Sequence, residues 1–298
     1  MHSPVAATIK KSAQRLEHDV WQAADALAHQ SRVGSRIENV IGAVTECEHR
    51  NWEALAEIRR MRLADETDPR WIDNFGKVAN VRDFGGLETT DGRRTRSGVL
   101  YRSSTPECAD ADDVDRLVDT LGVRSVIDLR TADEFAQHGH GLLDNRADID
   151  IVNYPISSPV RPVRGQAEFV KLYQECLEFS PQAFVAAARH IINADGAALV
   201  HCAHGKDRTG MLIAVLQHAV GVPRKAIQRD FELTNLRLEQ IRAIEGIRPP
   251  RAAVPQAMKQ FLDTLEGVGG GAGYLRTHGL TDGELTSLRE VLTTDSIR

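Results

Sequence analysis

The sequence predicts an α/β fold, in which a central, mostly parallel sheet is flanked by helices. From about residue 71 onward, short apolar segments typical of strands alternate with longer segments of helical periodicity. The clearest pair is the apolar run 197–200, followed after a polar loop by the apolar segment 211–216. A buried strand leading directly into a helix is typical of parallel sheets, whose connections are helical crossovers.

Residues 7–62 have a different pattern from the remainder of the chain. Apolar residues recur there at three- and four-residue steps, with an interruption at 31–35 that includes Gly34. We expect two amphipathic helices in a hairpin, and divide the chain into a helical extension at 1–68 and a main domain at 69–298. The apolar face of the hairpin must pack on the main domain or on a second copy of itself, which makes a homodimer an open alternative.

The main domain is expected to contain both kinds of element. Strands are predicted at 99–101, 123–129, 149–156 and 197–201. Helices are predicted at 109–121, 167–179, 182–193, 209–220, 224–245, 254–266 and 281–293. The glycine-rich segment Gly267–Gly273 follows no strand, so we interpret it as a flexible connection and not as a nucleotide loop.

The composition excludes several classes of function. A net charge of −5 and an isoelectric point near 6.1 argue against bulk binding to nucleic acid or to acidic membranes. No stretch approaches the roughly 18 apolar residues of a membrane span. The four cysteines form no CxxC pair and no zinc spacing, so we expect neither a metal nor a cofactor. A free nucleophilic thiol needs a reducing compartment, which favours the cytoplasm.

Residues 201–210 read HCAHGKDRTG and carry most of the chemical information. Cys202 lies at a strand end, and Arg208 opens a helix six residues later, so the backbone amides between them can converge on a tetrahedral dianion. Arg208 can add a bidentate contact, and the same positive field favours the thiolate of Cys202. The alternative is a buried structural cysteine beside surface charges. Burying the charged cluster between two apolar elements without a function would be costly.

These motifs resemble a known family. The pattern of Cys202 and Arg208 matches the Cys-x5-Arg signature of the protein tyrosine phosphatase superfamily, and is similar to the bacterial tyrosine and lipid phosphatases whose loop reads His-Cys-x-x-Gly-Lys-Asp-Arg. The segments Asn80–Gly86, Leu100–Ser103 and Val126–Arg130 resemble further parts of the same group. The resemblance covers about residues 75–295. It implies a phosphatase that works through a cysteinyl-phosphate intermediate.

The resemblance also implies roles for the residues around the loop. Ala203, His204, Gly205, Lys206 and Thr209 are expected to contact phosphate or, for Thr209, the sulfur; a helix N-cap is the other interpretation of Thr209. His201 is expected to order the base of the loop. Arg82 and Asp83 are expected to form an ion pair that braces the entry turn and so supports the loop.

The general acid is not where many relatives carry it. The loop 157–165, after the predicted strand 149–156, contains no acidic residue. The candidates are Asp207, inside the phosphate loop, and Asp128, at a neighbouring strand end. Asp207 beside Arg208 needs a bound dianion or desolvation to hold a proton. The resemblance favours Asp207 as acid with Asp128 assisting, whereas a structural partnership of Asp128 with Arg130 or Arg82 is the alternative.

The substrate is less well defined than the reaction. Lys206, with Arg161 and Arg164 on the facing loop, suits a substrate that carries more charge than one phosphomonoester. Phosphotyrosine proteins and phosphoinositides are the leading classes, and phosphorylated sugars or nucleosides are the alternative. A sulfurtransferase is a further alternative, against which Asp207, Thr209 and the segment 80–86 argue. A catalytically silent phosphate-binding module is another, against which the retention of Cys202, Arg208 and Asp207 argues.

Overall fold

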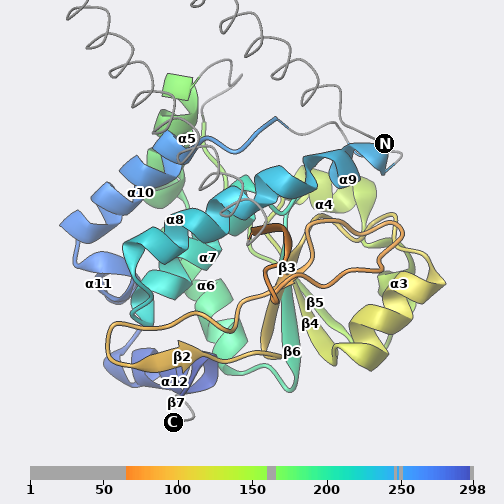
Figure 1. Cartoon of the computed structure of the whole chain (residues 1–298), viewed down its shortest axis with the longest axis horizontal. Coiled ribbons are helices and arrows are strands. Elements are labelled where there is room, and N and C mark those ends of the chain that lie inside the picture. Colours follow the sequence, from red (N-terminus) through yellow and green to blue (C-terminus); the bar gives the residue numbers. More distant parts are fainter. Residues whose placement is uncertain (1–64, 160–165, 245–246, 248–250, 296–298) are drawn as a thin grey trace, which may run out of the picture. The chain divides into compact units, whose positions relative to one another are not determined.

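A computed structural model describes residues 65–159, 166–244, 247 and 251–295. Its centre is a five-stranded sheet with the order β1-β3-β6-β4-β5 (Figure 1). The strands are β1 (Arg82–Asp83), β3 (Leu100–Ser103), β4 (Val123–Asp128), β5 (Asp150–Asn153) and β6 (Ala197–His201). β3, β6, β4 and β5 are mutually parallel, and β1 pairs antiparallel with β3. The predicted α/β class with a mostly parallel sheet is confirmed.

The sheet register brings three strand ends together. His201, the last residue of β6, pairs with Ser103 of β3 on one side and with Asp128 of β4 on the other. All three are therefore the final residues of parallel strands that end at the same edge. In open α/β sheets, ligands bind outside this carboxyl edge. The loop that follows β6 is thus placed between the segments that follow its two neighbours.

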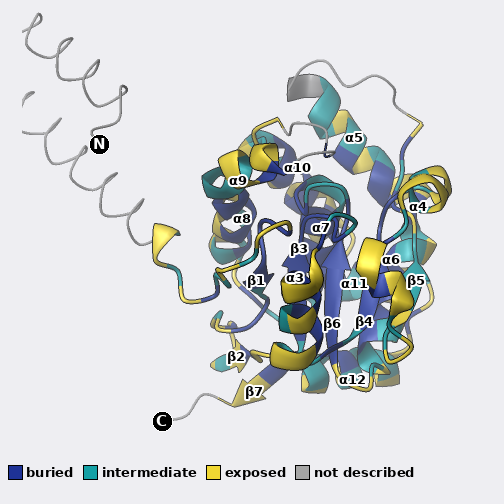
Figure 2. Ribbon diagram, turned by 90° about the vertical axis from the view of Figure 1, so that its right-hand side faces the viewer, coloured by how far each residue is buried: buried dark blue, intermediate teal, exposed yellow. Residues whose placement is uncertain are grey.

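Each face of the sheet packs into its own apolar core, because side chains alternate along a strand. Along β6, Ala198 and Val200 belong to a large core with the helices that follow β5 and β6, whereas Ala197 and Leu199 belong to a smaller core on the other face. The sheet is buried throughout its centre, and α3 presents its exposed side outward (Figure 2).

The helices of the larger core are mostly those that the periodicity predicts. They are α5 (Gln166–Phe179), α6 (Pro181–Ile192), α7 (Asp207–Ala219), α8 (Arg224–Leu233), α10 (Pro255–Gly267), α11 (Gly270–Thr277) and α12 (Asp282–Leu292). The predicted helix 224–245 is interrupted, since a 3₁₀ turn η3 (Thr234–Arg237) separates α8 from α9 (Leu238–Ala243). Likewise, the predicted helix 109–121 is an α-helix, α3 (Ala111–Asp115), continued by a π-helical turn η1 (Arg116–Thr120).

The interpretation of Gly267–Gly273 as a flexible connection is wrong, because α11 begins within it at Gly270. The glycines serve close packing of α11 on α7. A Cβ atom at Gly271 would lie 2.2 Å from the carbonyl oxygen of Val215 in α7, a separation that forces the helices apart. A run of glycines can therefore mark a tight helix–helix contact as well as a loop.

Several short elements were not expected from the sequence. They are α4 (Ala132–His138), a 3₁₀ turn η2 (Gly141–Asn145), and a two-stranded sheet of β2 (Arg93–Thr95) and β7 (Thr293–Asp295). Helix α4 carries a capping box, in which Thr131 and Glu134 exchange side chain to backbone hydrogen bonds. Among the described helices, none has the length and apolarity required to cross a membrane. The predicted amino-terminal hairpin lies outside the described residues.

Candidate active site

In the loop between β6 and α7, the carbonyl groups of residues 202–205 all face neighbouring groups of the protein. The Cys202 carbonyl faces Nδ1 of His201 at 3.2 Å, and the Ala203 carbonyl accepts from the Thr105 amide at 3.1 Å. Nδ2 of Asn80 donates to the carbonyls of residues 204 and 205, at 3.2 and 3.1 Å. In a trans peptide the carbonyl and the following amide point in opposite directions. The amides of residues 203–206 therefore point away from these partners, which makes a concave anion-binding site.

Gly205 is required for this shape. Its φ of +62° lies in the left-handed region, and a Cβ atom there would lie 2.1 Å from the carbonyl oxygen of Ser103. The loop thus packs its backbone directly on the end of β3. Cys202, at the start of the loop, is only 3% exposed.

Arg208 is held by an acid that the sequence reasoning missed. Its Nη1 and Nη2 donate to the two carboxylate oxygens of Glu134 at 2.6 and 3.1 Å. Burial disfavours the charge of Arg208, but Cys202 and Glu134 raise its pKa above the ordinary value. Burial also raises the pKa of Glu134, yet the contact with Arg208 outweighs this and lowers it to about 2. Glu134 contacts the Nη1 and Nη2 atoms at the end of the Arg208 guanidinium. The edge that carries Nε therefore remains available to an anion.

Asp207 is the acidic side chain at the start of α7 and is 24% exposed. The hydroxyl of Tyr173, a fully buried residue of α5, donates to its Oδ1 at 2.7 Å. The ammonium of Lys206 lies 3.3 Å from Oδ2. Burial, followed by the charge of Asp207, raises the pKa of Tyr173 well above its ordinary value, so that its hydroxyl acts as a donor. Both oxygens of Asp207 therefore have fixed partners.

The expectation that the side chain of Lys206 binds substrate phosphate is wrong. Its side chain is 2% exposed, and its ammonium donates to the carbonyl oxygens of Arg251 and Ala252 at 2.7 and 3.4 Å. It also lies 5.4 Å from the centre of the Phe169 ring. An ammonium has three donors, and carbonyl oxygens and the Asp207 carboxylate use them here. Lys206 thus fastens the segment before α10 to the loop.

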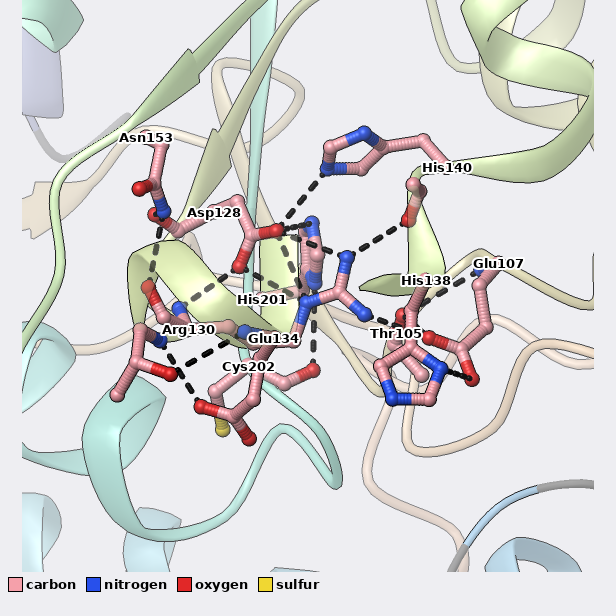
Figure 3. Close-up of polar contacts among 12 residues, drawn as sticks. Thr105, Glu107, Asp128, Arg130, Glu134, His138, His140, Asn153, His201 and Cys202 are labelled. Carbon is pink, nitrogen blue, oxygen red and sulfur yellow. Dashed lines mark hydrogen bonds and ion pairs between the residues drawn. The ribbon is translucent and has the colours of Figure 1, made fainter. Parts of the chain in front are cut away.

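Asp128 lies beneath the loop, where its carboxylate is fully buried (Figure 3). It accepts hydrogen bonds from the backbone amide and Nε of Arg130 and from Nε2 of His140, at 2.8, 2.9 and 3.1 Å. Burial raises its pKa, but His201, His140 and Arg130 together move it well below the ordinary value. The interpretation of Asp128 as a partner of Arg130 fits this geometry, and a proton donor to substrate does not.

His201 is fully buried beside Cys202, and burial lowers its pKa to about 4. The ring is therefore neutral at pH 7. Because a carbonyl only accepts, the proton lies on Nδ1, which faces the Cys202 carbonyl. Nε2 has no hydrogen-bond partner among the described residues and lies 3.9 Å from Asp128 Oδ2.

Asp128, His140 and His201 bring donor atoms within 4.8 Å of one another, close enough for a metal ion. The chemistry of the cluster does not fit one. The Oδ2 atom that would bind the ion already accepts from the Arg130 guanidinium at 2.9 Å, and a cation there would meet a fixed positive charge. We therefore assign this cluster to supporting the loop.

The expected ion pair between Arg82 and Asp83 does not form. The two residues are neighbours in β1, so their side chains point to opposite sides. Arg82 is fully buried, and donates to Asn80 Oδ1 at 2.5 Å and to the Asp230 carbonyl at 2.8 Å. Asp83 accepts from the amides of Gly85 and Gly98, which braces a turn and not the loop. Only Arg82 of this pair supports the phosphate loop, through Asn80.

The structure describes some of the remaining predicted site residues and not others. Thr209 is the third residue of α7 and not its N-cap, and its buried hydroxyl has no partner in the described part of the chain. Ala203 and His204 are partly exposed at the loop. Arg161 and Arg164 lie outside the described residues.

Glu134 and Tyr173 were not expected at the site. The capping-box pattern of Thr131 and Glu134 predicts a helix there, and that signal could have placed Glu134 beside the end of β4. Tyr173 carried no such signal, because an aromatic residue on the apolar face of a helix normally belongs to the core.

Together, a cysteine at a strand end, inward-pointing amides and a helix-opening arginine define a Cys-x5-Arg anion-binding loop. The chain belongs to the tyrosine phosphatase family, whose family model matches residues 74–294.

Individual relatives agree with this assignment. A candidate tyrosine-protein phosphatase of Cupriavidus necator is 34% identical over 179 residues, which cover 56% of this chain and 64% of that protein. The chain therefore spans less than two thirds of the length of this relative. The triple specificity protein phosphatase PtpB of Mycobacterium tuberculosis is 26% identical over 72% of this chain and 96% of its own length. Among solved structures, the core catalytic domain of the PP-IP phosphatase Siw14 from S. cerevisiae has a TM-score of 0.33 at 17% identity, covering 60% of this chain and 86% of that one.

Replacing Glu134 by glutamine is expected to lower kcat/KM for p-nitrophenyl phosphate by about tenfold to hundredfold, since a hydrogen bond between charged groups is lost. Glutamine can still complete the capping box, so the melting temperature of the protein should change little. Asp133→Asn, which removes an exposed acid from the same helical turn, is the matched control. Equal kcat/KM in wild type and Glu134→Gln would show that Arg208 needs no positioning by this residue.

Proposed function

We propose that this protein is a phosphomonoester hydrolase that uses Cys202 as nucleophile, on phosphotyrosine and phosphoinositide substrates. One observation carries the proposal: the loop after Cys202 turns every carbonyl of residues 202–205 toward the protein. Its amides are then free to hold the equatorial oxygens of a phosphoryl group, together with Arg208. Phosphoryl transfer requires mainly positioning and charge neutralisation, which this loop can supply.

The reaction would proceed in two steps. In the first, the Cys202 thiolate attacks phosphorus, a sulfur–phosphorus bond forms, and the bond from phosphorus to the leaving oxygen breaks. The leaving oxygen takes a proton from the general acid. In the second step, water attacks phosphorus and gives a proton to the deprotonated acid, the sulfur–phosphorus bond breaks, and the Cys202 thiolate leaves with inorganic phosphate as product. The buried hydroxyl of Thr209, unpartnered among the described residues, is suited to stabilise the departing sulfur.

For the general acid we propose Asp207. Its side chain is partly exposed at the start of α7, whereas that of Asp128 is fully buried. A proton donor must be able to reach the leaving oxygen.

The relatives support the substrate proposal. Lys206 does not, because its ammonium donates to the backbone carbonyls of residues 251 and 252. The chain belongs to a tyrosine phosphatase family, and one relative is named for triple specificity. A panel of phosphotyrosine peptides, phosphoinositides, and phosphorylated sugars and nucleosides tests it, with EDTA present to remove divalent metals. We expect turnover of the first two classes, unaffected by EDTA. Preference for the metabolites would replace the proposed substrates, and no turnover in any class would refute the proposed activity.

We further propose that residues 1–68 form a separate helical unit that pairs in a homodimer, and that the protein acts in the cytoplasm. The apolar periodicity of 7–62 and the requirement of Cys202 for reducing conditions support these two statements. Sedimentation of the full chain at several concentrations tests the dimer, and a monomer throughout would contradict it. Fractionation of cells that express the protein tests the location.

A further inference from the structure

A cluster of arginines lies behind the phosphate loop, on the side opposite the inward-pointing amides. Arg70, Arg82 and Arg102 all contact the buried carboxylate of Asp230, at 2.7, 3.3 and 3.0 Å. Arg102 is 2% exposed and lies in β3, the strand beside β6. Burying several guanidinium groups around one carboxylate is costly, so the arrangement calls for a reason beyond stability.

Arg102 differs from the other two because it also reaches the loop. Its Nη1 donates to Asp230 Oδ2 at 3.0 Å, while its Nη2 donates to the Gly205 carbonyl at 2.7 Å. Burial lowers the pKa of Arg102, while the neighbouring Asp230 and Cys202 act in the opposite direction. Asp230 thus holds one edge of the guanidinium while the other edge holds the loop.

Asn80, two residues before β1, reaches the same carbonyl. It has a φ of +59°, in the left-handed region that asparagine tolerates better than most residues. Its Nδ2 lies 3.1 Å from the Gly205 carbonyl and 3.2 Å from the His204 carbonyl, and Arg82 fixes its Oδ1. The strained backbone is thus retained at a residue whose amide contacts two consecutive loop carbonyls.

We propose that Arg102 and Asn80 are positioning residues for phosphate binding, which set the orientation of the 204–205 and 205–206 peptides. Their contacts hold two carbonyls behind the loop, and the amides of Gly205 and Lys206 consequently face the anion. Asp230 acts through Arg102 as the group that keeps its guanidinium in place. Without these contacts, a peptide could flip and present a carbonyl oxygen to the phosphate, which would repel it.

The test compares Arg102→Met with Arg70→Met in the full chain. Arg70 contacts the same Asp230 and is similarly buried, but its other hydrogen bonds go to Asp68 and none is recorded to the loop. Each variant removes one guanidinium and leaves two on Asp230. A merely structural role would affect both alike, whereas a positioning role affects Arg102 alone.

The first readout is the dissociation constant for inorganic phosphate, measured by calorimetry, with the melting temperature recorded for each variant. We expect Arg102→Met to weaken phosphate binding by about tenfold to hundredfold, as for the loss of a hydrogen bond from a charged donor. Arg70→Met should bind within about twofold of wild type, and Arg102→Lys should restore part of the loss. Equal losses in the Arg102 and Arg70 variants would overturn the proposal.

A second variant keeps the test informative if Arg102→Met fails to fold. Asn80→Gly removes the amide but tolerates the left-handed backbone, so its expected effect is again weaker phosphate binding with a folded protein. Unchanged binding in this variant would overturn the role of Asn80. The inference rests on the proposed phosphatase site, but its failure is distinguishable. If wild type neither binds phosphate nor hydrolyses phosphoesters, the proposed function fails; if only the variant pattern is absent, the positioning role fails.

Discussion

Replacing Cys202 by serine is expected to lower kcat by at least about 10⁴-fold, a loss on the scale seen when a nucleophile is removed from other hydrolases. A serine hydroxyl is a far weaker nucleophile than a thiolate. The loop amides and Arg208 are untouched, so inorganic phosphate should still bind. Steady-state turnover of p-nitrophenyl phosphate measures the loss of kcat, and calorimetry measures whether phosphate binding is retained.

The control is Cys108→Ser, which changes a partly exposed cysteine outside the loop and should leave kcat unchanged. Acid-quenched wild type should also carry a phosphorylated Cys202 peptide, detectable by mass spectrometry, that the Cys202→Ser protein lacks. Near-normal turnover by Cys202→Ser would refute the covalent mechanism altogether.

Replacing Asp207 by asparagine should separate substrates by their leaving groups. General acid catalysis contributes about 10²- to 10⁴-fold, and an alkyl phosphate needs all of it because an alkoxide is a poor leaving group. p-Nitrophenolate leaves without a proton, so kcat for p-nitrophenyl phosphate should fall much less. Parallel measurement of kcat on both substrates checks this. Equal losses would move the proton donor to another residue.

Tyr173→Phe gives a milder version of the same comparison. Within the described part of the chain, the hydroxyl of Tyr173 donates to Asp207, and the ring packs in the core, so phenylalanine preserves the packing. If Tyr173 positions the acid, alkyl phosphates should again lose more activity than p-nitrophenyl phosphate. The pH dependence of kcat for alkyl phosphates should also shift, whereas a purely structural effect would lower both substrates together without a shift.

The main features of the fold could be predicted because they depend on local patterns. β6 and α7 are apolar runs of the lengths expected for a strand and a helix, and the loop between them carries a specific signature. The sheet class followed from the alternation of such segments. Helix α11 was not predicted, because the tight approach of Gly271 to Val215 is a tertiary contact that composition does not reveal.

The candidate site was predictable only along the loop itself. The roles proposed for Cys202 and Arg208 remain predictions, but their positions followed from one decapeptide. Glu134 lies 74 residues from Arg208 in sequence, and no local pattern links the two. For Lys206, the sequence suggested a side-chain contact that the structure does not contain. A lysine in a phosphate loop suggests an anion contact, yet its flexible stem lets the ammonium turn back to carbonyls of the segment at 251–252.

The register of the central sheet sets the tolerance of the whole site to change. Ser103, His201 and Asp128 end three adjacent strands in one row, so the segments after them reach the phosphate loop from fixed starting points. Sliding any one strand by a single residue would displace its end by about 3.3 Å, which is longer than a hydrogen bond. Surface connections between these strands can vary in length without this consequence. The geometry of the site therefore depends on the alignment of these strands, and so do the positions of the side chains in the loop.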